Sequence, residues 1–190
     1  MARFVVVYGS GEGHTGKIAE HIRALYEELG HQVELVHGKS VPADFDVADY
    51  DGVIVGASIH MGKHQKYMVN FARRYADALL PKLSAFFTVC LTAHSEKAAD
   101  KAQVGEYIEE FIDATQWYPD QIGVFAGALL YTKYGLIKRF IMKRVSQQAG
   151  NATDTSRDYE YTDWESVDEF AEMFLAATVD QPVMADGMLV

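Results

Sequence analysis

A run of glycines and hydroxyl side chains near the amino terminus, Ser10-Gly11-Glu12-Gly13-His14-Thr15-Gly16-Lys17, has the spacing of phosphate-binding loops. Three patterns overlap in it. Gly11-x-Gly13-x-x-Gly16 matches a dinucleotide-binding fingerprint, and Gly11-x-x-x-x-Gly16-Lys17 matches most of a nucleoside-triphosphate P-loop. In the third pattern, the hydroxyls of Ser10 and Thr15 surround a single phosphate at the start of a helix.

Two of the three patterns lack a residue that their chemistry needs. A P-loop requires Ser or Thr after the lysine to hold magnesium, and Ile18 stands there. A dinucleotide site requires an acidic residue about 20 positions on, where the second strand ends Val36-His37-Gly38-Lys39. Hydroxyls, backbone N–H groups and the helix dipole are sufficient for a single phosphate. We therefore expect one phosphate at Ser10–Thr15, with a Gly-rich turn that binds nothing as the alternative.

Short apolar strands that alternate with helices must position this loop. The apolar runs predict strands at 4–8, 32–37, 52–56, 85–91 and 122–130, and a further short strand at 158–161. Helices are predicted at 15–29, ending at Gly30, and at 64–80, 101–115 and after a Thr162-x-x-Glu165 capping box. This order predicts an α/β fold, a doubly wound five-stranded parallel sheet with helices on both faces. Residues 1–178 form one domain in this interpretation, and 179–190 form a tail.

Composition excludes several classes of protein. At 190 residues, one domain can bury about 70% of its unfolded surface. The single cysteine, Cys90, lies in an apolar run and is expected to be buried. A net charge of -10 argues against a nucleic-acid partner. No run approaches the roughly 20 apolar residues of a membrane span, and no basic segment precedes the first strand, so we expect a cytoplasmic protein.

The loops after the first, third and fourth strands carry a resemblance to flavodoxins. Ser10 to Thr15 resembles the flavodoxin phosphate loop, 56–62 stands where that superfamily contacts the flavin ring, and 92–95 forms a third loop after the fourth strand. The resemblance implies bound FMN at the carboxyl ends of the strands. It implies these cofactor-binding residues: Ser10, Gly11, Glu12, Gly13, His14, Thr15, Ala57, Ser58, Ile59, His60, Met61, Gly62, Thr92, Ala93 and His94. Many flavodoxins carry an aromatic residue where His60 and Met61 stand, so the residue that stacks on the ring is left open.

A more specific resemblance extends from residue 1 to about 178. The segments GASIHMGKH (56–64), SAFFTVCL (84–91), QWYPDQIGVFAGALLY (116–131), RFIMK (139–143), TDT (153–155) and YTDWE (161–165) resemble the flavodoxin-type, menaquinone-dependent protoporphyrinogen IX dehydrogenases. This implies FMN-dependent oxidation of protoporphyrinogen IX in haem biosynthesis, with electrons passed to a membrane quinone of the menaquinone type. It also implies a fifth strand split by an insert at about 131–157. A flavodoxin that carries electrons between proteins, or a flavin-dependent quinone reductase, is the alternative.

Most of the insert lies in a stretch, 121–153, that contains no acidic residue. Its basic and aromatic side chains are expected to contact the porphyrinogen propionates or a membrane surface: Tyr131, Lys133, Tyr134, Lys138, Arg139, Lys143 and Arg144. A surface helix packed on the sheet is the alternative. Peripheral contact with the inner face of the cell membrane and oligomer formation stay open. We expect no acid–base dyad, because the flavin performs the redox chemistry, and no metal, because His60-x-x-x-His64 lies on a glycine-containing loop.

Overall fold

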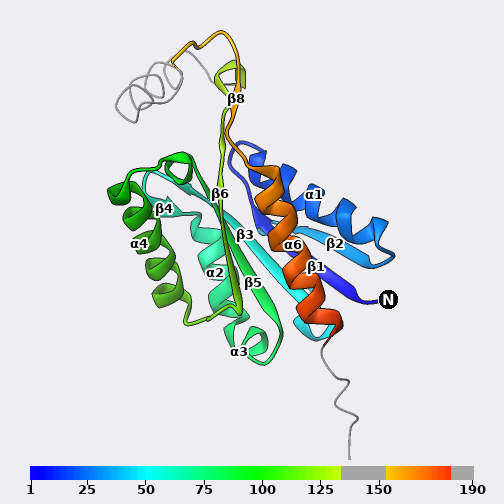
Figure 1. Ribbon diagram of the computed structural model, residues 1–190. Helices are drawn as coiled ribbons and strands as arrows, with labels where there is room; N and C mark the ends of the chain where they lie inside the picture. The colour runs from blue at the N-terminus through cyan, green and yellow to red at the C-terminus, as the bar shows by residue number, and fades with distance from the viewer. Residues whose placement is uncertain (134–152, 181–190) are drawn as a thin grey trace, which may run out of the picture.

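The computed structural model describes residues 1–133 and 153–180. Its centre is a parallel sheet in the order β2-β1-β3-β5-β6, with a short β4 (Lys63–His64) paired to β3 (Figure 1). The parallel strands are β1 (Arg3–Gly9), β2 (Gln32–His37), β3 (Gly52–His60), β5 (Ser84–Cys90) and β6 (Gln121–Ala126). The strand order reverses between β1 and β3, so the predicted doubly wound five-stranded sheet is confirmed.

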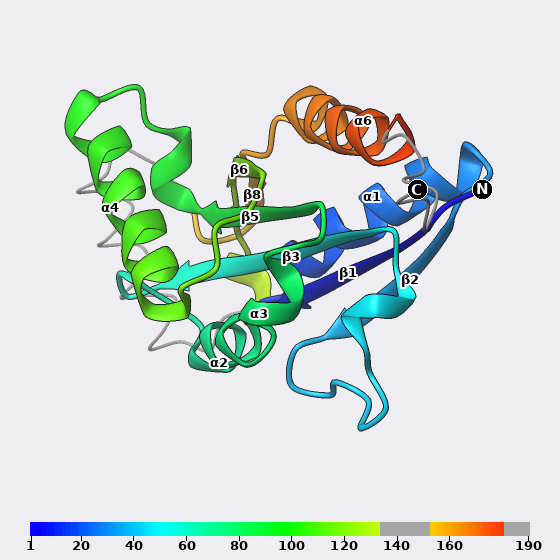
Figure 2. The same cartoon turned by 90° about the horizontal axis from the view of Figure 1, so that it is seen from below.

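Helices cover both faces of the sheet (Figures 1 and 2). One face packs against α1 (His14–Glu28) and α6 (Trp164–Val179), and the other against α2 (Lys66–Arg74), α3 (Ala76–Leu79) and α4 (Ala98–Thr115). Three short 3₁₀ helices complete the described chain: η1 (Val47–Asp49), η2 (Leu91–His94) and η3 (Tyr131–Lys133). Alternate residues of β1 enter the two cores, Phe4 and Val6 on the α1 side, Val5 and Val7 on the α2 side. Both faces of the strand are therefore apolar, as the sequence predicts.

The fifth strand differs from the prediction. β6 ends at Ala126, and the next segment, β7 (Ala128–Leu129), pairs antiparallel with β8 (Tyr159–Glu160) in a separate two-stranded ribbon. The ribbon projects beyond the sheet (Figure 1). The neighbouring strand β5 ends at Cys90, whose carbonyl accepts the N–H of Gly127 at 3.2 Å as the last bond of this ladder. Beyond it β7 has no parallel partner among the described residues, so the insert opens from a ribbon and does not split the strand within the sheet.

Two predictions about the helices are also wrong. The helix predicted at 64–80 breaks at Tyr75 into α2 and α3. The capping box does not form, because the Asp163 carboxylate caps α6 by accepting the N–H groups of Glu165 and Ser166 at 3.1 and 3.4 Å. The Thr162 hydroxyl instead forms hydrogen bonds with the Ala126 carbonyl and the His14 ring.

Other expectations agree with the structure. Gly30 ends α1 with φ +85°, and Cys90 is buried and unpaired. Among the described helices, none is long and apolar enough to cross a membrane. The predicted tail at 179–190 falls mostly outside the described residues, and α6 continues to Val179.

Candidate functional site

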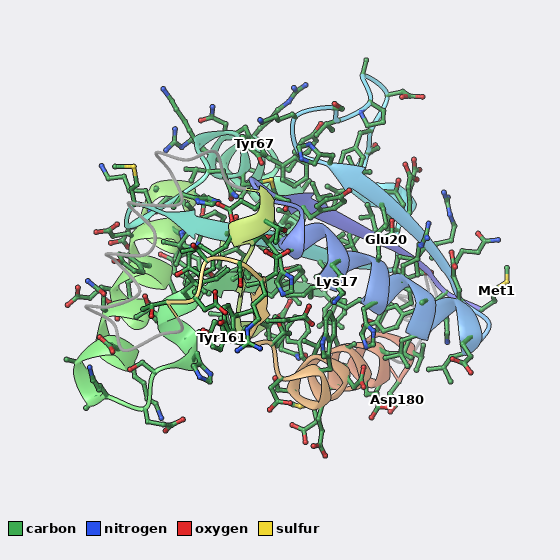
Figure 3. All side chains as sticks on the ribbon, turned by 90° about the horizontal axis from the view of Figure 1, so that it is seen from above. Met1, Lys17, Glu20, Tyr67, Tyr161 and Asp180 are labelled. Atoms are coloured by element: carbon green, nitrogen blue, oxygen red, sulfur yellow. The ribbon has the colours of Figure 1, made fainter. Side chains whose placement is uncertain are left out.

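The three loops singled out from the sequence meet at one edge of the sheet. β1 and β3 are adjacent and in register from Phe4 and Gly52 to Gly9 and Ala57, and β3 pairs with β5 as far as Ser58 and Val89. The carboxyl ends of these strands therefore bring 10–15, 59–62 and 92–94 together. Figure 3, which looks onto this edge, labels Lys17 from α1, Tyr67 from α2 and Tyr161 after β8 around it.

The loop at 10–15 has the geometry of an anion site. The Ser10 hydroxyl oxygen accepts the N–H of Gly13 at 2.8 Å. Gly13 has φ +96°, a left-handed conformation that favours glycine, and a Cβ there would meet nothing within 4 Å. α1 begins at the next residue, and no described side chain caps its amino terminus. Its first N–H groups and its dipole are thus available to a phosphate, beside the Thr15 side chain, which is buried.

The second segment is a hairpin and not the open loop predicted at 56–62. β3 runs on to His60 and pairs antiparallel with β4 (Lys63–His64). The two turn residues, Met61 and Gly62, have φ of 52° and 76°, as a type I′ turn requires. Met61 is fully exposed at its tip.

The residues of this segment have different surroundings. A Cβ on Gly11 would lie 2.6 Å from Nε2 of His60, so the absence of a side chain there lets the His60 ring lie on the phosphate loop. Ile59 is partly buried. Ala57 and Ser58 lie inside β3 and are buried, and the Ala57 methyl belongs to the core on the α2 side. The prediction that Ala57 binds the cofactor could hold only for its backbone.

The third segment, 92–94, lies in η2. Thr92 and Ala93 are partly buried, whereas His94 is exposed. The His94 ring lies 4.6 Å from the ring of Tyr161, centroid to centroid, at an interplanar angle of 37°. Tyr161 follows β8, so the chain returning from the insert reaches the third loop.

The predicted substrate contacts are mostly outside the described residues. This applies to Tyr134, Lys138, Arg139, Lys143 and Arg144, and to the side chain of Lys133. Tyr131 is placed differently from the expectation. Its side chain is completely buried with Leu129, in a cluster that also includes Tyr159 and Tyr161. It is a core residue of the ribbon in this structure, and does not face solvent.

Sequence reasoning missed two residues at this edge, Gln65 and Tyr67. The Gln65 side-chain oxygen accepts the N–H of Ser58 at 3.0 Å, and its amide nitrogen donates to the Gly9 carbonyl at 3.3 Å and to the Ser58 hydroxyl. This amide ties the end of β1 to the end of β3. No local pattern marks it, because its partners lie 7 and 56 positions away.

Tyr67 brings a buried hydroxyl to the phosphate loop. Its oxygen is buried and its O–H has no acceptor among the described residues, and a Cβ on Gly9 would lie 3.1 Å from the oxygen. Burial raises the pKa of Tyr67, and the nearby backbone N–H of Ser10 partly offsets that rise. A buried hydroxyl without a partner is costly, so this one has donor capacity to offer a ligand at the loop.

Comparisons with known proteins give a family for this arrangement. A model of the flavodoxin domain matches residues 5–156. Protoporphyrinogen IX dehydrogenase [quinone] of Escherichia coli strain K12 is 33% identical over 182 residues, which cover 95% of this chain and 98% of that protein. The chain belongs to the flavodoxin-type protoporphyrinogen IX dehydrogenase family. The protein of the same name from Leishmania major is 33% identical over 181 residues, 94% of this chain and 77% of that protein.

A solved flavodoxin supports the fold by itself. The crystal structure of oxidised flavodoxin 1 from Bacillus cereus superimposes with a TM-score of 0.53 at 16% identity, over 95% of this chain and 99% of that one. The arrangement described here is therefore the flavodoxin fold with a ribbon added after its fifth strand.

The described site residues of this flavodoxin-family chain fit a flavin mononucleotide. The uncapped start of α1, the hydroxyls of Ser10 and Thr15 and the unpartnered hydroxyl of Tyr67 suit a phosphate and its sugar chain. His60 is the last residue of β3, and His94 lies in η2, which follows β5. Within residues 1–133 and 153–180, no three His, Cys, Asp or Glu side chains are grouped as a metal site would need.

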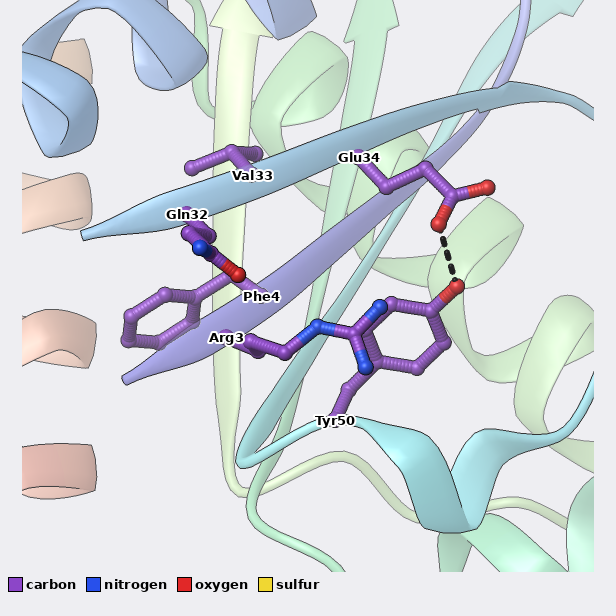
Figure 4. A pocket seen from close by; sticks show the side chains of 6 residues that line it. All are labelled: Arg3, Phe4, Gln32, Val33, Glu34 and Tyr50. Carbon is purple, nitrogen blue, oxygen red and sulfur yellow. Dashed lines mark hydrogen bonds between the residues drawn. The ribbon is translucent and has the colours of Figure 1, made fainter. Parts of the chain in front are cut away.

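A separate shallow pocket lies at the opposite, amino-terminal ends of the strands (Figure 4). There Tyr50 donates a hydrogen bond to the Glu34 carboxylate at 2.6 Å, and the Arg3 guanidinium lies 5.3 Å from the Tyr50 ring centre. Burial and the Glu34 carboxylate raise the pKa of Tyr50. These groups satisfy one another, and the pocket is not part of the site.

Proposed function

We propose that this chain binds FMN at the carboxyl edge of its sheet and oxidises protoporphyrinogen IX to protoporphyrin IX, with a membrane quinone as acceptor. The observation that carries the proposal is the length of the relationship to the E. coli dehydrogenase, 98% of that protein and 95% of this chain. A match of this length must include the ribbon and the insert, so the sequence similarity is not confined to the flavodoxin core.

In this proposal the protein holds and orients the flavin. The α1 N–H groups, Ser10 and Thr15 bind the phosphate, and the loops carrying His60 and His94 flank the ring. FMN, when bound, supplies two-electron redox chemistry. The overall reaction removes six electrons and six protons from the porphyrinogen in three two-electron steps, and three quinones become three quinols. The His60 ring lies against Gly11 of the phosphate loop.

The substrate and acceptor are assigned by charge and by family. The porphyrinogen carries propionate groups, which the acid-free stretch 121–153 complements with its lysines and arginines. We propose a menaquinone-type acceptor and a cytoplasmic protein that contacts the inner face of the membrane peripherally. The same basic stretch supports that contact.

The test uses the purified full chain. It should take up FMN, with an oxidised-flavin absorbance that persists through gel filtration. Under anaerobic conditions it should form protoporphyrin faster than free FMN does, in the presence of a menaquinone analogue. Protein that exchanges electrons with a reduced protein partner but leaves the porphyrinogen unchanged would instead be an electron carrier.

A second acceptor separates the finer claims. A ubiquinone analogue in place of the menaquinone analogue tests the class of quinone, since equal rates contradict a preference for menaquinone. Ser10→Ala is the control for flavin dependence, because it removes a phosphate ligand at an exposed loop without opening the core. Its rate should recover as FMN is added in excess.

A further inference from the structure

The chain that returns from the insert is bonded directly to the start of α1. We call residues 159–164 the return segment. Nε2 of His14 lies 2.5 Å from the Thr162 hydroxyl oxygen, and the Lys17 ammonium lies 2.7 Å from the Glu160 carboxylate. The other Glu160 oxygen accepts the indole N–H of Trp164 at 2.7 Å. Two of these partners, His14 and Lys17, belong to the first turn of the helix whose amino terminus forms the phosphate loop.

The hydrogen bond between His14 and Thr162 has a defined direction. The Thr162 hydroxyl donates its proton to the carbonyl of Ala126 at 2.7 Å. Its oxygen must then accept from His14, so Nε2 of His14 carries a proton. Burial lowers the pKa of His14 more than the nearby Glu160 raises it, which favours the neutral ring with that one N–H. The two hydrogen bonds therefore point the same way: His14 in the phosphate loop donates to Thr162, and Thr162 donates to the Ala126 carbonyl at the end of β6.

The Lys17–Glu160 and His14–Thr162 contacts contribute unequally to holding the return segment on α1. The Lys17 and Glu160 side chains are 56% and 36% exposed, and ion pairs so exposed contribute little. His14 is only 9% exposed. Without the Thr162 oxygen, the N–H of His14 would have no hydrogen-bond partner at a position that water reaches poorly. The orientation of His14 thus depends mainly on Thr162.

We propose that Thr162 is a positioning residue for the cofactor site, and that FMN binding and docking of the β7–β8 ribbon stabilise each other through it. The proposal rests on the proposed FMN binding. His14 lies between Gly13 and Thr15 within the phosphate loop, so a bound phosphate that orders the loop also fixes the ring that holds Thr162. Because such coupling is reciprocal, a docked ribbon strengthens FMN binding.

The structure offers a matched control further along α1. His21, on α1, lies 2.6 Å from the carboxylate of Asp168 on α6. This contact also joins α1 to the chain after the ribbon, but it lies two turns beyond the phosphate loop. Asp168→Asn therefore weakens the attachment of α6 without disturbing His14.

The first measurement is the dissociation constant of FMN, from quenching of its fluorescence. Thr162→Val keeps the shape of the side chain and removes the oxygen, and we expect FMN binding to weaken about 5- to 20-fold, within the usual range of coupling between sites. Thr162→Ser restores the oxygen and should restore the affinity. Glu160→Gln should weaken binding about twofold or less, and Asp168→Asn should leave it unchanged. Thermal unfolding of each variant reports separately on stability.

The second measurement is amide hydrogen exchange in peptides that contain β7 and β8. FMN should slow exchange there in the wild type and in Asp168→Asn, and should slow it much less in Thr162→Val. Neither measurement uses a porphyrin, so a failure of porphyrinogen oxidation alone contradicts the proposed activity and not this coupling. The coupling is overturned if Thr162→Val binds FMN as tightly as the wild type, or if FMN leaves exchange in the ribbon of the wild type unchanged.

Discussion

Met61 occupies a position that its residue type does not favour, and replacing it should make the protein more stable. It is the first of two turn residues in the β3–β4 hairpin, with φ 52°, and its side chain is fully exposed. Left-handed backbone costs an ordinary L-residue about 1–2 kcal/mol, and asparagine is several-fold enriched in that region. Met61 has no packing to lose, so Met61→Asn should raise the free energy of unfolding by about 0.5–1 kcal/mol.

The assay is urea unfolding of the flavin-free protein, with thermal unfolding in parallel. For a domain of this size, the expected gain corresponds to an increase in Tm of about 1–4 °C. Met61→Leu keeps an apolar side chain and the same backbone cost, and should be close to neutral. Met173 is also exposed, at 65%, but lies in α6, so Met173→Asn should destabilise by a few tenths of a kcal/mol through helix propensity.

Met61→Asn and Met173→Asn should change the free energy of unfolding in opposite directions. If Met61→Asn destabilises the protein, or if Met61→Leu and Met61→Asn shift stability equally, the backbone conformation is not the cause. Local rules are broken most often where function requires it. We therefore also expect Met61→Asn to reduce porphyrinogen turnover, because an exposed apolar side chain at the flavin edge is replaced by a polar one.

Three further changes have defined outcomes. Ser10→Ala should weaken FMN binding about 10-fold or more by removing a hydrogen bond to a charged phosphate, and equal affinity would contradict the assigned cradle. Tyr26→Phe removes the buried bond of 2.6 Å to the Ala171 carbonyl and should cost about 1–2 kcal/mol in urea unfolding. Burial lowers the pKa of His64 from 6.5 to about 4, so the unfolded chain binds more protons between these values, and stability falls as pH falls through that window by at most about 3 kcal/mol. In His64→Gln, urea unfolding at both ends of the window should show a smaller loss than in the wild type.

The sheet and its loops could be predicted because their signals are local. Each apolar run marks a strand, and the loop at 10–15 carries its own glycines and hydroxyls. Parallel strands then place successive loops at one edge without further information.

The remaining features depend on partners distant in sequence. Tyr67 reaches the phosphate loop from α2, and its own surroundings in the sequence are those of an ordinary helix residue. Thr162 looks like a helix cap until Ala126 and His14 are placed beside it. Pairing of β7 with β8 depends on where β5 ends, which no pattern at 121–130 records.

The most direct test of the account is an anaerobic titration of the FMN-loaded protein with protoporphyrinogen IX, followed by visible absorbance. We expect the oxidised-flavin band to bleach as porphyrin absorbance appears, and a menaquinone analogue to restore the band. A flavin spectrum that stays unchanged when protoporphyrinogen is added, in protein that retains its FMN, would contradict the proposed activity.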